Sequence, residues 1–352
     1  VSPGEVHALN AERARSWPLG MTTTSTHDTK RGEDAAARIA VLAELPRIWA
    51  STVRRWHELT LPAATTDTAA PELTHIYGLF QAIAGGWPFG WDGHAGREEF
   101  RDRVKEYALK AARETKTRTS WLNQDTDYEA AVTGFVERAF ADEAFVEHAH
   151  GFCALIAPYG AGNALAQCLL RLCSPGVPDT YQGSELWQQS FVDPDNRRPV
   201  DFERRQSALA ALRARLNDRG PLARELLGRY EDGDIKLYVT HLALQARKAQ
   251  PELFLRGDYT ALPGGQHVVA FTRGFEDARL ICVVPRLVYT LTRGERPWAL
   301  ADAWGDASLE LRHSGNYVNV FTGARLALSG TAALRDIFAE FPLALLLRED
   351  TT

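Results

Sequence analysis

The spacing of apolar residues predicts helices through most of the first 250 positions. A segment that opens at Glu33 carries apolar side chains at three-residue intervals, which gives a helix one buried face. A second apolar stripe, made of phenylalanines, lies in a helix expected over residues 127–156. The first face consists of Ile39, Leu42, Leu45 and Ile48, and the second of Phe135, Phe140, Phe145 and Phe152. Other helices are expected over residues 3–16, 73–86, 98–117 and 202–249, with a buried one starting near residues 160–163.

The pattern changes after residue 253 to short apolar runs separated by Gly, Asp and Pro. These runs cover residues 268–271, 280–284, 317–321 and 344–347. Short strands at such spacing are typical of an antiparallel β-sandwich. Two isolated strands are expected earlier, over residues 20–26, which are rich in β-branched side chains, and over residues 177–181.

Polar residues follow the first of these isolated strands at once. His27 and Asp28 close it, and Lys30 and Arg31 come directly after them. If the strand belongs to a parallel α/β barrel, this pair stands at its carboxyl end, where such barrels carry out their chemistry. The alternative is an ordinary polar loop at a strand end.

A second polar segment covers residues 192–201 and is dense in carboxylates, amides and guanidinium groups. Two prolines restrict its backbone, and its candidate ligand-binding side chains are Asp193, Asn196 and Arg197. A rigid polar loop of this kind suits a ligand rich in hydroxyl groups. The alternative is a structural loop held together by salt bridges.

The amino-acid composition indicates which kinds of ligand the protein binds. The net charge of −5 disfavours a nucleic-acid footprint, while nine Trp and ten Tyr lean towards a carbohydrate ligand. The basic residues of the 98–117 helix are expected to form mainly a solvated face. The four cysteines show no CxxC pair and no metal-ligand spacing, so we expect free thiols in a reducing cytoplasm. We see no signal peptide and no apolar run long enough to cross a membrane.

The order of these features resembles the last part of the α-amylase family of glycoside hydrolases. A Thr/Ser-rich strand ends in His27-Asp28, a Gly-x-Pro-x-x-Tyr-x-Gly-x-Glu pattern covers residues 176–185, and the sandwich pattern follows. Within that family the chain is most similar to the maltooligosyltrehalose synthases, through residues 25–34, 110–121 and 193–201.

The resemblance implies an α/β fold that holds only the last strands of a TIM (β/α)8 barrel. Strand seven would end the first segment, a large helical insertion would follow, and strand eight would precede the polar loop and further helices. A C-terminal antiparallel β-sandwich would complete the chain. The corresponding ranges are 1–28, 29–172, 173–250 and 251–352.

The resemblance also implies an activity. Enzymes of this kind convert the reducing-end α-1,4 link of a maltooligosaccharide, an α-1,4-glucan, to an α,α-1,1 link by intramolecular transglucosylation, without a cofactor or metal. Of the three acids the family uses, only the third has a match here, Asp28, which would bind the 2- and 3-hydroxyls of the sugar. Because no residue matches the nucleophile or the acid/base, we expect the natural protein to begin upstream of Val1, or the missing N-terminal barrel portion to act as a partner.

The other candidate residues take their roles from the same resemblance. His27 would bind a hydroxyl of the sugar that Asp28 holds, and the remaining residues would line the pocket in which the released glucose turns. For Lys30 and Arg31 the alternative is pairing with the acids at positions 33 and 34. The pocket residues would be Lys30, Arg31, Asp193, Asn196 and Arg197.

Two further classes of function stay open. The isolated chain could be a structural, carbohydrate-binding remnant without turnover, because two strands cannot close a barrel. A metal-dependent phosphohydrolase could use His27-Asp28, but it would need further His and Asp ligands on neighbouring helices, and no such spacing is present.

Overall fold

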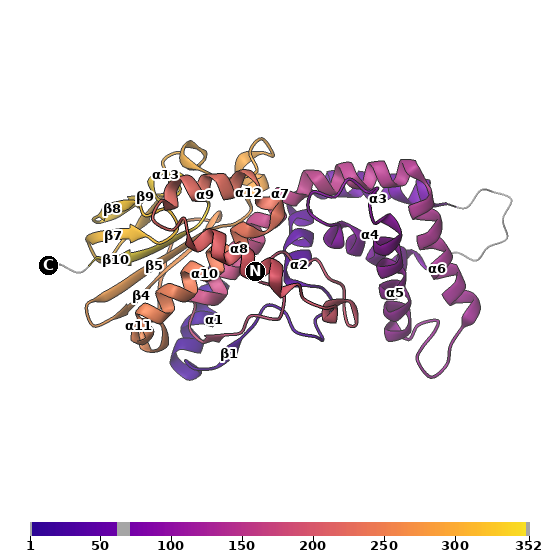
Figure 1. Ribbon diagram of the computed structural model, residues 1–352, viewed down its shortest axis with the longest axis horizontal. Coiled ribbons are helices and arrows are strands. Elements are labelled where there is room, and N and C mark those ends of the chain that lie inside the picture. Colours follow the sequence, from indigo (N-terminus) through magenta and orange to yellow (C-terminus); the bar gives the residue numbers. More distant parts are fainter. Residues whose placement is uncertain (1, 62–70, 350–352) are drawn as a thin grey trace. The chain divides into compact units, whose positions relative to one another are not determined.

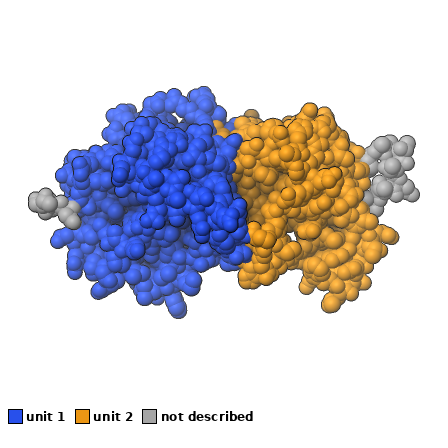
Figure 2. Space-filling model, viewed as in Figure 1, with its two compact units in different colours: residues 1–26, 161–187, 200–352 blue, residues 27–160, 188–199 orange. Residues whose placement is uncertain are grey.

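The computed structural model describes residues 2–61 and 71–349. Residues 60–72 are rich in Thr, Ala and Pro and are expected from the sequence to form a surface loop, and most of them lie outside the described residues. The chain divides into two compact units (Figure 2). Unit 1 contains residues 1–26, 161–187 and 200–352, and unit 2 contains residues 27–160 and 188–199. These units follow contacts in space, whereas the four ranges expected from the sequence follow the chain and stay a prediction.

Unit 1 is built on a six-stranded antiparallel sheet with the strand order β3-β4-β5-β10-β7-β8 (Figure 1). Its strands are β3 (Thr260–Leu262), β4 (Val268–Phe275), β5 (Ala278–Pro285), β7 (Gly315–Asn319), β8 (Arg325–Leu328) and β10 (Ala344–Arg348). A separate antiparallel ribbon consists of β6 (Ser308–Glu310) and β9 (Thr331–Ala333). The antiparallel strands predicted beyond residue 253 are therefore confirmed.

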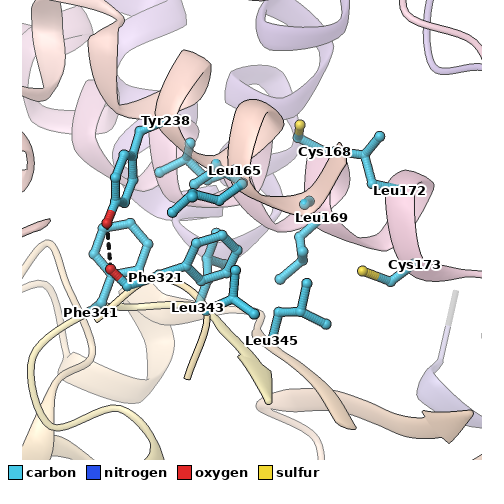
Figure 3. Packing of buried hydrophobic residues seen from close by; sticks show 14 of the residues in the cluster. Leu165, Cys168, Leu169, Leu172, Cys173, Tyr238, Phe321, Phe341, Leu343 and Leu345 are labelled. Carbon is cyan, nitrogen blue, oxygen red and sulfur yellow. Dashed lines mark hydrogen bonds between the residues drawn. The ribbon is translucent and has the colours of Figure 1, made fainter. Parts of the chain in front are cut away.

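Helices cover one face of this sheet and form the main core of unit 1 (Figure 3). Leu280, Cys282 and Val284 are alternate residues of β5 and therefore point to one face of the sheet. They belong to the same buried cluster as the second half of α7 (Glu143–Cys173). At one side of this cluster the Tyr238 hydroxyl donates a hydrogen bond of 2.5 Å to the Phe321 carbonyl (Figure 3). The helices of unit 1 are α1 (Pro3–Ser16), α8 (Phe202–Arg213), α9 (Arg219–Gly228), α10 (Asp234–Ala249), α11 (Pro251–Arg256), α12 (Val288–Thr292) and α13 (Leu334–Ile337), with 3-10 turns at η3 (Tyr230–Asp232) and η4 (Ala301–Trp304).

The two isolated strands pair with each other in parallel but are shorter than the sequence predicts. They are β1 (Met21–Thr22) and β2 (Val177–Pro178), in the register Met21↔Val177. Beyond β1, the Thr23 hydroxyl donates to the Ser25 carbonyl at 2.8 Å and accepts from the Ser25 N–H at 3.3 Å. Such local side-chain hydrogen bonds compete with a strand ladder, so the seven-residue strand expected over 20–26 is wrong in length.

Unit 2 is helical around an aromatic core. The buried Trp56 ring has centroid distances of 5.3–5.8 Å to Phe80, Phe145 and Phe152. All four phenylalanines of the predicted stripe are buried, which confirms that stripe as core. The elements of unit 2 are α2 (Glu33–Ala40), η1 (Val41–Glu44), α3 (Pro46–Thr60), α4 (Leu73–Gly86), α5 (Arg97–Thr115), α6 (Thr126–Ala141), the first part of α7 (Glu143–Cys173) and η2 (Asp195–Arg197).

Helix α7 runs unbroken for 31 residues, through Pro158 and through residues 160–163, where the sequence predicts a new helix start. Among the described residues it is the one helix long and apolar enough to cross a membrane by length and composition, so the expectation that no apolar run reaches that length is wrong. However, 67% of its most apolar window is buried inside the protein, as in a core helix. Its length and apolar character are thus accounted for by packing.

Candidate functional site

The predicted His-Asp pair lies at the surface of unit 2, a few residues beyond β1. The His27 and Asp28 side chains are 57% and 85% exposed, and His27 Nε2 lies 3.2 Å from Asp28 Oδ2. Both side chains are therefore accessible to a ligand, which an acid that binds sugar hydroxyls requires.

Lys30 meets a partner that the sequence did not suggest. Its ammonium group donates to Glu114 Oε2 on α5 at 2.6 Å. Lys110 lies one turn before Glu114 on α5. Its ammonium nitrogen is 3.8 Å from the Glu114 carboxylate and donates a hydrogen bond of 2.6 Å to the Asp193 carbonyl. The Arg197 guanidinium in turn donates to Asp193 Oδ1 at 2.5 Å. Positive and negative groups thus alternate from Lys30 to Arg197.

The backbone of Arg31 links the first polar segment to the residue that precedes the second one. Its backbone forms an antiparallel bridge with Phe191, and its guanidinium carbon is 5.7 Å from the centroid of the Tyr107 ring. The next residue, Gly32, donates its N–H to the Ser190 carbonyl at 2.8 Å. A Cβ atom on Gly32 would lie 2.5 Å from the Gln188 carbonyl oxygen, so this close approach requires glycine.

The polar loop is anchored by a buried ion pair. Asp195 is buried, and its two oxygens accept from Arg103 Nε at 2.7 Å and Arg103 Nη2 at 2.9 Å. The Phe191 N–H donates to the same carboxylate at 2.7 Å. The salt-bridged structural loop considered for this segment therefore describes Asp195 well.

The three loop residues predicted as ligands separate into two kinds. Asn196 is only 3% exposed and donates to the His27 carbonyl at 2.9 Å, so it positions the His-Asp segment. Asp193 and Arg197 keep 26% and 54% of their side chains exposed. The Arg197 hydrogen bond lowers the pKa of Asp193 despite an opposing effect of burial, and the charges of Arg197, Lys110 and His27 add to the decrease. Except for Arg31, which lies against Tyr107, the predicted residues gather around one charged surface.

The residues that sequence reasoning missed come from α5. Arg103, Lys110 and Glu114 all contact the site, and they recur with Tyr107 at intervals of four, three and four residues. That spacing marks one face of a helix. The expectation of a mainly solvated basic face is wrong for Lys110, and for Arg113, which pairs at 2.7 Å with the buried Glu129.

The described part of the chain contains no group of three or more His, Cys, Asp or Glu side chains arranged to hold a metal ion. All four cysteines are buried and free. The accessible carboxylates and imidazole of Asp28, Asp193 and His27 can form hydrogen bonds with a polyhydroxylated ligand.

No family model matches the chain. A curated relative named putative maltooligosyl trehalose synthase, from Mycobacterium tuberculosis strain H37Rv, is 37% identical over 354 aligned positions, which cover 99% of this chain and 40% of the relative. The solved maltooligosyltrehalose synthase from Arthrobacter ramosus is 33% identical with a TM-score of 0.78, covering 99% of this chain and 41% of that one. A hypothetical maltooligosyl trehalose synthase from Sulfolobus tokodaii is 29% identical with a TM-score of 0.75, at 99% and 41% coverage. The chain spans about 40% of the length of the curated relatives it matches.

Proposed function

We propose that the chain, which matches maltooligosyltrehalose synthases along 99% of its length, is the C-terminal part of such an enzyme and serves intramolecular transglucosylation of a maltooligosaccharide. In the proposed reaction the reducing-end α-1,4 link becomes an α,α-1,1 link, so the product has no reducing end. The observation that carries the proposal is 37% identity across 99% of the chain.

In this proposal β1 and β2 are the last two strands of a (β/α)8 barrel, and the antiparallel sheets form the C-terminal sandwich. The parallel register of β1 and β2 supports the first assignment, because neighbouring strands of such a barrel are parallel. His27 and Asp28 follow β1 at its carboxyl side, where barrel enzymes place their chemistry. The preceding barrel strands would be supplied by a portion equivalent to the part of the relatives that this chain does not match.

Asp28 is proposed to stabilise the transition state. Retaining glycoside chemistry places a nucleophile and an acid/base about 5 Å apart, and its transition state resembles an oxocarbenium ion. A third carboxylate bound to the 2- and 3-hydroxyls attracts this ion more strongly as its charge grows, so it lowers the barrier. Because 85% of its side chain is exposed, water screens the Asp28 charge in this chain, and the effect on the transition state would increase once substrate and the remaining barrel cover it.

The neighbouring residues are proposed to hold the glucose that turns between the two bonds. His27 would donate to a hydroxyl of the sugar bound by Asp28, and Lys30 would contact the turning glucose with its ammonium group oriented by Glu114. Asp193 and Arg197 offer an acceptor and donors on the same surface. A closed pocket is needed because water would otherwise hydrolyse the covalent glucan intermediate.

The test is complementation. The purified 352-residue chain is incubated with maltopentaose, alone and together with the N-terminal part of the Arthrobacter ramosus synthase, and the loss of reducing ends is measured. We expect no loss with either polypeptide alone and a loss when both are present. Trehalose-ended product from the chain alone would overturn the three-acid account. Glucan binding without product in the mixture would favour the second candidate, a carbohydrate-binding structural role.

A further inference from the structure

Unit 2 carries an open groove of about 660 Å³ between α4 and the consecutive elements α2, η1 and α3. None of the seven predicted site residues lines this groove, and its lining is apolar apart from Tyr77, Gln81 and Arg54. We propose that the groove docks an acidic amphipathic helix of a partner protein. The inference does not rest on the proposed reaction.

The apolar surface of the groove is accessible to a partner. Ala43, Pro46 and Ala50 line one side of it and are exposed. Tyr77 of α4 is 43% exposed, and Leu73, one turn earlier on the same face of α4, is 70% exposed. Exposed apolar side chains that gather in one place mark interaction sites on soluble proteins.

The base of the groove is apolar and its rim is held in place. Leu42 and Trp49 are each 6% exposed and line the buried part of the groove. The Trp49 indole N–H donates to the Tyr77 hydroxyl at 3.0 Å, so the indole leaves no unpaired polar atom there. The same hydrogen bond orients the Tyr77 side chain, and tyrosines are frequent anchors of protein interfaces.

The shape of the groove favours a helix over a small molecule. Pro46, Ala50 and Val53 recur at intervals of four and three residues, so they form a ridge along α3. Pro46 and Ala50 have short side chains, which let the axis of a second helix come close. Pockets for small ligands enclose most of the ligand surface, whereas this groove is open to solvent. A helix that packs its own ridge beside that of α3 therefore fits better.

The groove is flanked by positive charge without a partner, which selects an acidic helix. Arg54 lines the groove, and Arg47 lies seven residues, or two turns, earlier on the same face of α3. Neither guanidinium forms an ion pair with another described residue, whereas the neighbouring Arg55 pairs with Glu58 at 3.3 Å. Two such cations, about 10 Å apart along the helix axis, match two carboxylates seven residues apart on a helix that lies along α3.

The experiment is a selection followed by binding measurements. A display library of randomised helical peptides, each of about 18 residues, is selected on the full 352-residue chain, and the retained sequences are compared with the input library. The retained peptide of highest affinity is then titrated by fluorescence anisotropy against the wild-type chain and its variants.

Each variant has a matched control. Ala50→Trp fills the groove, and Ala130→Trp, at an exposed position of α6 in the same unit, is its control. Arg54→Glu reverses the charge beside the groove, and Arg55→Glu makes the same change in net charge at a residue that does not line it. Circular dichroism establishes that each variant is folded.

We expect the retained peptides to carry apolar residues at intervals of three and four, with an excess of Asp and Glu seven residues apart. Ala50→Trp should weaken binding roughly tenfold or more, and Arg54→Glu roughly tenfold, while both controls stay within about twofold of wild type. A peptide in which lysines replace the acids should bind Arg54→Glu better than it binds the wild-type chain.

Three results would overturn the proposal. The first is that no peptide is retained above the input library. The second is binding that survives Ala50→Trp, or retained peptides without an excess of acids. The third is self-association of the wild-type chain that Ala50→Trp abolishes, because a second copy would then cover the groove. Failure of the proposed reaction would leave these outcomes unchanged.

Discussion

Replacement of Asp195 by asparagine removes the anchor of the polar loop. The carboxylate accepts three hydrogen bonds, two from Arg103 and one from the Phe191 N–H, at 2.7–2.9 Å. Asp195→Asn keeps the shape but turns one acceptor oxygen into a donor amide. The Arg103 guanidinium, whose side chain is 14% exposed, then faces a neutral group.

The loss of stability expected for Asp195→Asn follows from the burial of the Asp195–Arg103 pair. Removing one partner of a buried ion pair costs about 3–5 kcal/mol because the other charge is left uncompensated. Arg103 keeps its hydrogen bond to the Gln189 carbonyl at 3.2 Å, and asparagine keeps one acceptor, so we expect a loss near the lower limit, about 3 kcal/mol in the free energy of unfolding. The matched control is Asp302→Asn, which removes the exposed pair with Arg296 and should leave the free energy of unfolding almost unchanged.

The pH dependence of the Asp195 effect has a defined sign. Burial alone would raise the pKa of Asp195, but the hydrogen bonds and charge of Arg103, with the Phe191 N–H, outweigh burial and lower it. A carboxyl whose pKa is lower in the folded state contributes stability that is present above its unfolded pKa, about 3.9. The difference between wild type and Asp195→Asn should therefore be constant from pH 5 to 8 and decrease below about pH 4.

Urea unfolding followed by tryptophan fluorescence and circular dichroism measures the difference. We expect a lower urea midpoint for Asp195→Asn than for Asp302→Asn, with similar slopes. Equal midpoints for the two variants would refute the claim that the buried pair holds the loop.

Three other predictions concern local features. Gly32→Ala should lower the free energy of unfolding by about 1–3 kcal/mol because its Cβ would lie 2.5 Å from a carbonyl oxygen. Gly151→Ala, in open space on α7, should instead raise it by about 0.5–1 kcal/mol, and thermal unfolding shifts of the same sign would contradict this pair. Burial raises the pKa of Cys153 to about 12, and all four thiols are buried. A thiol reagent at pH 8 should therefore label none of the four cysteines before the protein unfolds. Rapid labelling of the folded protein would contradict this burial. Glu114→Gln should lower kcat/KM of the reconstituted enzyme roughly fivefold by releasing Lys30, and an unchanged value would exclude Glu114 as a positioning residue.

Periodicity in the sequence predicted those parts of the fold in which one face is buried. The phenylalanine stripe of α6 and α7 and the antiparallel strands after residue 253 are examples, because burial imposes a repeat of 3.6 or 2 residues. The length of β1 was not predictable in this way. Hydrogen bonds between Thr23 and Ser25 compete with the ladder there, although threonine favours strands.

The candidate site was predictable only in part, for a related reason. A local motif is enough to single out an exposed residue such as Asp28. The roles of Asn196 and Asp195 could not be predicted in this way, because they depend on hydrogen-bond partners elsewhere in the chain. Arg103 and Glu114 could have been singled out by their common helix face, but nothing local indicates what that face contacts. Likewise, Gly160 and Gly162 suggested a helix start near residues 160–163, but α7 continues through them as a helix that is mostly buried.

The most direct test of the account is the activity of Asp28→Asn in the complementation mixture. If Asp28 stabilises the oxocarbenium-like transition state, kcat for loss of reducing ends should decrease by roughly 10²–10³-fold, since groups that act on transition-state charge contribute effects of that size. The Asp302→Asn control should retain wild-type turnover. Turnover by Asp28→Asn equal to that of the control would contradict the assignment of Asp28.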